Sequence, residues 1–131
     1  MKKMLCLAVF ALGLATPAVA EDWVWVDIDN SNGDPYVIFG DADSRTDNSA
    51  WFEARFTKPQ KSGNGKFYNI VKILGEVDCR GKRSRLVTAM AYSKSGKFID
   101  SDTPSYAKWN YVIPGTSEES AYKFVCNRYP R

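Results

Sequence analysis

Histidine is absent from all 131 residues of the chain, and cysteine is scarce, with Cys6, Cys79 and Cys126 as its three occurrences. The absence of histidine excludes Ser-His-Asp and Cys-His catalytic groups and metal sites built on imidazole. The chain also shows no internal repeat, no linker and no low-complexity segment. These absences favour one small domain that binds rather than catalyses.

The first residues have the pattern of an export signal. Two lysines precede an apolar run from Met4 to Leu14, and Ala18 to Ala20 supply the small residues of a cleavage site. A membrane anchor is the alternative, but the run is shorter than the roughly 20 residues that span a bilayer. Lipidation of Cys6 is disfavoured because this residue begins the run. We therefore expect residues 1–20 to be removed, and residues 21–131 to reach the periplasm or outer cell surface with no membrane span.

Two cysteines, Cys79 and Cys126, remain after removal of the signal. An even number in an oxidising compartment favours one disulfide, with two free thiols as the alternative. Closing a loop of about 48 residues stabilises a domain by about 4 kcal/mol in the chain-entropy model. The disulfide would therefore supply a large share of the stability.

Alternating residues in Trp23 to Asp29 and Arg83 to Ser93, and aromatic, β-branched or aliphatic residues in other segments, indicate several strands in residues 21–131. In the first strand, Trp23 to Asp29, we expect Val24, Val26 and Ile28 to form a buried aliphatic face. Further strands are predicted at Tyr36 to Gly40, Ala50 to Thr57, Phe67 to Cys79, Arg83 to Ser93 and Phe98 to Asp100. Between the third and fourth, Pro59 to Lys66 is predicted to be a basic loop.

A helix is predicted at the C-terminal end of the chain. Thr116 and Glu119 form a capping box, and Pro114-Gly115 interrupts the chain before it. Ala121, Phe124, Val125 and Cys126 recur at helical spacing, so one stripe faces the sheet. The predicted class is α+β: an antiparallel sheet of about six strands with one C-terminal helix packed on it and tied by the disulfide.

Charge is unevenly distributed along the chain. Residues 21–53 hold nine carboxylates and one arginine, whereas residues 54–131 hold fifteen lysines and arginines and six acids. Lys82, Arg83 and Arg85 form the candidate binding patch, which would suit a protein partner or an anionic glycan. The alternative is that these charges only solubilise turns. A nucleic-acid partner is not expected in the envelope, and a homodimer is left open.

Carboxylates are the remaining candidates for chemistry. Asp27, Asp29, Glu76 and Asp78 are available for acid–base hydrolysis, but no pattern indicates a raised pKa or a cleft. Asp41, Asp43 and Asp47 could gather a weak cation, although acid-rich turns are the favoured interpretation. We therefore expect no enzyme activity, no cofactor and no specific metal site.

Several segments together resemble a known family. These are the strand end Glu76-Val77-Asp78-Cys79, the strand from Arg85 to Tyr92, the helix entry Ile113-Pro114-Gly115-Thr116, the terminal Val125-Cys126 and the opening Trp25 to Asp29. They resemble the surface-adhesin protein E family of exported Gram-negative proteins. The resemblance implies a six-stranded antiparallel sheet with its C-terminal helix tied by one disulfide, and it carries over only Cys79 and Cys126. It implies an adhesin-like module that recognises host or matrix proteins, the alternative being a soluble periplasmic protein that binds or inhibits another envelope component.

Overall fold

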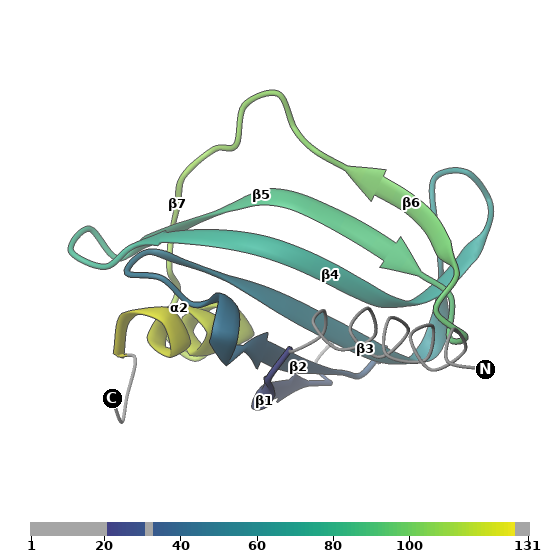
Figure 1. The fold of residues 1–131 in the computed structure, drawn as a ribbon, viewed down its shortest axis with the longest axis horizontal. Helices are drawn as coiled ribbons and strands as arrows, with labels where there is room; N and C mark the ends of the chain where they lie inside the picture. Colours follow the sequence, from purple (N-terminus) through teal and green to yellow (C-terminus); the bar gives the residue numbers. More distant parts are fainter. Residues whose placement is uncertain (1–20, 31–32, 128–131) are drawn as a thin grey trace, which may run out of the picture.

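The computed structural model describes residues 21–30 and 33–127, so the predicted signal peptide lies outside the described residues. The strands are β1 (Trp23–Asp29), β2 (Tyr36–Asp41), β3 (Ser49–Lys61), β4 (Phe67–Asp78), β5 (Arg83–Tyr92), β6 (Phe98–Asp102) and β7 (Asn110–Tyr111). A short 3-10 helix, η2 (Ala42–Ser44), follows β2, and helix α2 (Ser117–Asn127) comes last. Antiparallel pairing in the order β1-β2-β3-β4-β5-β6, with β7 beside β5, confirms the predicted α+β class (Figure 1).

Two strand assignments differ from the prediction. Strand β3 continues to Lys61, so the start of the expected loop at Pro59 belongs to a strand. Its pairing with β4 is irregular between Arg55 and Gln60. Pro59, which has no backbone N–H to donate, is tolerated there because regular pairing with the neighbouring strand is interrupted. Strand β7 was not predicted, since two residues are too few for a period-two pattern.

The predicted buried face of β1 is wrong. Val24 and Ile28 are 41% and 52% exposed. The pairing with β2 shifts between Trp25 and Asp27, and a bulge of this kind turns the side chains that follow it, including Ile28, to the opposite face. Asp27 consequently faces the helix, where its Oδ2 accepts a 2.7 Å hydrogen bond from Ser120 Oγ. Val24 precedes the bulge, so the shift in pairing does not account for its exposure.

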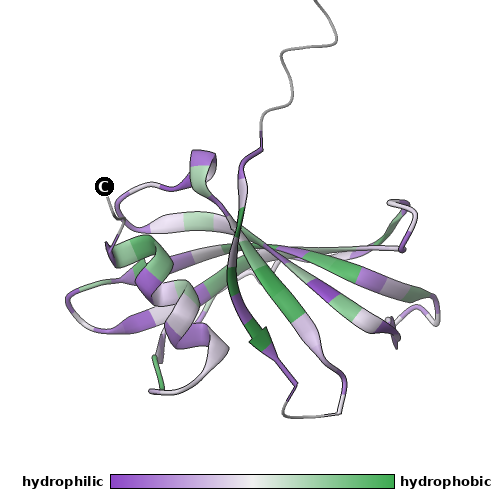
Figure 2. Ribbon diagram, turned by 90° about the horizontal axis from the view of Figure 1, so that it is seen from below, coloured by the Kyte–Doolittle hydropathy of each residue, from purple (hydrophilic) through white to green (hydrophobic). Residues whose placement is uncertain are grey.

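The core lies between α2 and one face of the sheet, called the helix face below. Figure 2 shows α2 lying across one end of the sheet. Gly40 of β2 permits this close packing, because a Cβ there would lie 2.6 Å from the Phe124 ring. The buried cluster comprises Ala50, Phe52, Val77 and Val125.

Helix α2 begins as the sequence predicts. The N–H of Glu119 donates to Thr116 Oγ1 at 3.2 Å, and the Glu119 carboxylate accepts from the N–H of Gly115 at 3.0 Å. The first bond satisfies a backbone donor of the first turn, and the second ties Glu119 to the residue before the cap. The start of the helix is therefore set locally.

The other end of α2 is fixed by covalent and polar contacts. Cys79 and Cys126 form a disulfide, which confirms the predicted pairing. The Tyr122 hydroxyl donates to the carbonyl of Cys79 at 2.5 Å, and Arg45 Nη1 donates to the carbonyl of Phe124 at 3.1 Å. The helix is thus held against the end of β4.

Candidate functional site

The candidate patch lies at the turn between β4 and β5, on the sheet face opposite the helix face. Arg83 forms an ion pair with Asp78, with 2.8 Å between Nη2 and Oδ2. Its Cζ atom also lies 5.3 Å from the centre of the Trp109 ring. Arg83 is therefore held between a carboxylate and an indole.

Arg85 repeats this arrangement two residues further along β5. Its Nη2 lies 2.7 Å from Glu76 Oε1, and its Cζ lies 4.4 Å from the centre of the Trp109 ring. The two arginines share one indole because alternate residues of a strand point to the same face. Trp109 also belongs to this surface, although it was not predicted from the sequence as part of the patch. Only the connection from β6 to β7 brings it beside β5.

Lys82 differs from the two arginines. It adopts a left-handed backbone conformation with φ of 54°, and its side chain is exposed. None of the ion pairs found within residues 21–30 and 33–127 involves Lys82. The structure thus brings all three predicted residues to one turn, with Lys82 as the exposed charge and the arginines as part of a packed framework.

The carboxylates considered for hydrolysis all have structural partners. Arg83 and, to a smaller degree, the N–H of Gly81 lower the pKa of Asp78, so this side chain stays ionised. Glu76 pairs with Arg85, Asp27 accepts from Ser120, and Asp29 accepts from the hydroxyl of Tyr36. Burial, followed by the charge of Asp29, raises the pKa of Tyr36. Each of these four carboxylates is therefore engaged in a contact that holds the fold together.

The acidic residues that follow β2 organise a turn. Asp41 accepts hydrogen bonds from the N–H groups of Asp43, at 3.0 Å, and Asp22, at 3.1 Å. Within the described part of the chain, no three Asp, Glu, Cys or His residues are grouped so that they could hold a metal ion. The carboxylate of Asp41 therefore caps η2 and anchors the start of β1.

A second candidate site is an apolar groove on the helix face beside α2, which the sequence interpretation missed. Its volume is about 420 Å³. It is bordered by residues of β2 to β5 and α2, among them Tyr36, Ile38, Phe52, Phe56, Ile73, Leu86 and Tyr122. Strand patterns alone indicate a core position for the strand residues among these, and only the position of α2 decides that part of the helix face stays open.

Together, the antiparallel sheet and its disulfide-tied C-terminal helix define a small α+β domain of the kind found in exported proteins. The model of the surface-adhesin protein E family matches residues 25–127, and the chain belongs to this family. It is accordingly an exported, adhesin-like protein, and the family is one of surface adhesins rather than of enzymes.

Comparison with curated proteins gives no match, and neither does comparison with solved structures. Among the described residues, no helix has the length and apolar character needed to cross a membrane.

Proposed function

We propose that the protein is a cell-envelope adhesin module that recognises an acidic surface of a host or matrix protein through the patch Lys82, Arg83, Arg85 and Trp109. Membership of the surface-adhesin protein E family supports binding as the activity. The observation that carries the choice of surface is the stack of two arginines on the Trp109 ring.

This arrangement suits protein recognition for an energetic reason. Arginine and tryptophan are enriched among residues that dominate binding energy, particularly where their conformations are fixed in advance. Asp78 and Glu76 hold the arginines in place through ion pairs of 2.8 Å and 2.7 Å. The exposed ammonium of Lys82 adds a charge that can steer an acidic partner toward the turn.

The geometry also decides which substitution tests the patch. Reversing the charge of Arg83 or Arg85 would leave Asp78 or Glu76 without its ion-pair partner, so a loss of binding would be confounded with altered packing. Lys82→Glu changes an exposed charge and leaves these ion pairs intact. Lys94→Glu, in the exposed turn between β5 and β6, makes the same change away from the patch.

The experiment measures association of residues 21–131 with immobilised matrix proteins by surface plasmon resonance. We expect Lys82→Glu to slow association about tenfold and Lys94→Glu to leave it unchanged. Binding should weaken as salt is raised to about 0.5 M, because salt screens exposed charges. A partner insensitive both to this salt concentration and to Lys82→Glu would exclude the patch, and capture only by sulfated glycans would replace the protein partner with an anionic glycan.

Location separates this proposal from its alternative, a soluble periplasmic protein that binds or inhibits another envelope component. Protease treatment of intact cells should degrade an adhesin displayed on the surface. Protection until the outer membrane is permeabilised would favour the periplasmic alternative. A periplasmic protein of known location serves as the control for envelope integrity.

A further inference from the structure

The groove beside α2 is an unfilled part of the helix face. Its volume of about 420 Å³ falls within the 300–1,000 Å³ typical of small-molecule sites. Ile38, Phe52 and Ile73 line the groove, as does Leu86, which has 39% of its surface exposed. The groove is therefore large enough for a ligand rather than for one or two waters.

Small residues on two neighbouring strands create the hollow. Ala54 of β3 and Gly75 of β4 both line it. A Cβ at Gly75 would make only an ordinary contact, 3.6 Å from the Phe52 ring. By contrast, the space above Gly40 is filled by Phe124 of the same chain. The space above Gly75 is thus left open rather than required for packing within the described residues.

The groove is long as well as apolar. Its lining along β4 extends from Val71 to Val77, which corresponds to roughly 20 Å of extended strand. Aliphatic and aromatic side chains follow this length, from Phe56 at one end to Tyr122 at the other. An extended hydrocarbon chain matches this shape better than a compact ring does.

Along β3 and β4, the groove offers no hydrogen bonds to a peptide backbone. No buried side-chain nitrogen or oxygen in residues 21–30 and 33–127 lacks a hydrogen-bond partner. The backbone groups of β3 and β4 are engaged in the antiparallel ladder. A peptide lying there would give up hydrogen bonds to water without replacing them, whereas a hydrocarbon has none to lose.

Polar groups gather at one end of the groove, where β5 meets the start of α2. Ser84 Oγ donates to Glu118 Oε2 at 2.5 Å. Ser117, the preceding residue of α2, also lines the groove, and its Oγ lies 3.4 Å from the hydroxyl of Tyr36. Glu76 and Arg85 lie nearby but neutralise each other as an ion pair. The charge that remains is the carboxylate of Glu118, which repels an anionic head group and accepts hydrogen bonds from hydroxyl groups.

We propose that this groove binds a single-chain amphiphile with an uncharged, hydroxyl-bearing head group. The tail lies along β3 and β4 over Ala54 and Gly75, and the head meets Ser84, Ser117 and Glu118. This site goes beyond the proposed adhesin contact. Arg85 and its partner Glu76 border the groove as well as the patch, but Lys82 and Trp109 do not line the groove. Lys82→Glu and Gly75→Val therefore test the two sites separately.

The test uses disulfide-bonded residues 21–131 and 1-monolauroylglycerol below its micellar concentration. Calorimetry should show saturable 1:1 binding, with dodecanoate about tenfold weaker because of repulsion by Glu118. Glu118→Gln should reduce that difference. In methyl NMR spectra, Ile73 should shift on binding while Leu74, on the opposite face of β4, should not.

Filling the groove provides the second arm. Gly75→Val should lower affinity at least about tenfold, whereas Gly63→Val, which adds the same bulk where nothing lies within 4 Å, should not. Melting temperatures show whether Gly75→Val folds. If it does not, Leu86→Ser, which removes an apolar side chain from the groove lining, is used in its place and should weaken binding. Absence of saturable binding, equal shifts at Ile73 and Leu74, tighter binding of dodecanoate, or equal effects of the two glycine variants would each overturn the proposal.

Discussion

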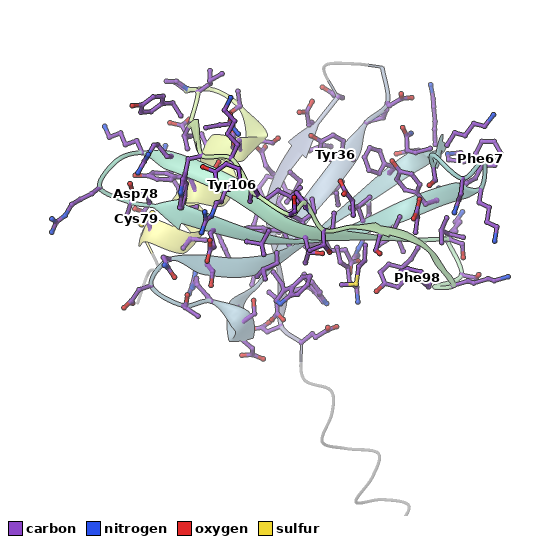
Figure 3. The ribbon with its side chains drawn as sticks, turned by 90° about the horizontal axis from the view of Figure 1, so that it is seen from above. Tyr36, Phe67, Asp78, Cys79, Phe98 and Tyr106 are labelled. Carbon is purple, nitrogen blue, oxygen red and sulfur yellow. A yellow bond between two sulfur atoms is a disulfide. The ribbon has the colours of Figure 1, made fainter. Side chains whose placement is uncertain are left out.

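The two ends of the sheet are held by different forces. The end under α2 contains the buried cluster of Ala50, Phe52, Val77 and Val125 together with the disulfide. At the far end Phe67 and Phe98 are 56% and 54% exposed. Figure 3 shows Asp78 and Cys79 at one end, and Phe67 and Phe98 at the other.

Hydrogen bonds between the β3–β4 turn and β6 hold the far end together. Ser62 Oγ donates to Asp100 Oδ2 at 2.7 Å, and Asn64 Nδ2 donates to the carbonyl of Ile99 at 3.0 Å. Exposed hydrogen bonds stabilise a fold less than apolar burial and a covalent link do. The helix end should therefore be the stable unit and the far end the first to open.

Removal of the disulfide should have the largest effect. Replacing Cys79 and Cys126 together by alanine should lower the free energy of unfolding by about 4 kcal/mol, because the unfolded chain regains the entropy of a long loop. Urea denaturation followed by circular dichroism measures this change. A loss below about 1 kcal/mol would show that the core alone secures α2.

Truncating one aromatic ring at each end compares the two regions directly. Phe52→Ala should cost about 3 kcal/mol, because this ring is buried and meets Phe124 with 5.7 Å between ring centres. Phe98→Ala should cost less than about 1 kcal/mol, since that exposed ring has an edge contact with Tyr92. Equal costs in chemical denaturation would contradict the proposed difference between the ends.

A methyl group added to a glycine should distinguish the ends by steric crowding. Gly40→Ala should cost about 2 kcal/mol, because the new Cβ would lie 2.6 Å from the Phe124 ring, which Phe52 and Arg45 hold in place. Gly63→Ala is the control in the far turn, where nothing lies within 4 Å. Melting temperatures of both variants provide the measurement, and a tolerated Gly40→Ala would show that α2 can shift.

The smallest effect concerns acid stability. The pKa of Asp78 is lowered chiefly by Arg83, and that of Asp100 chiefly by the hydroxyl of Ser62. Each carboxylate therefore stabilises the fold at pH values above its ordinary pKa of about 4. This stabilisation is lost as the pH falls through the lowered pKa.

Asp78→Asn and Asp100→Asn should each flatten the fall of unfolding free energy between about pH 5 and pH 2. Added salt should reduce the Asp78 contribution more, because only Asp78 pairs with a cation. The measurement is urea denaturation of both variants and the unaltered chain across this range, at low and high salt. The same acid dependence in all three would refute the assignment.

Much of the fold could be predicted because its determinants are local. The ends of β2, β4 and β5 were predicted to within one residue. A period-two pattern indicated β5, because burial of one face requires it, and β-branched and aliphatic residues indicated β4. Thr116 and Glu119 indicated the start of α2 because their capping bonds span only a few residues. Cysteine parity indicated the disulfide because export leaves one pairing available.

The sequence by itself therefore determined the α+β class, the disulfide and a basic turn containing Lys82. Tertiary structure alone decided the bulge that turns Asp27 toward α2, the stacking of Arg83 and Arg85 on Trp109, and the open groove over Gly75. These features depend on register and on contacts between residues far apart in the chain. Such contacts produce no periodic pattern in the sequence, because each residue involved fits the pattern of its own strand or helix equally well without them.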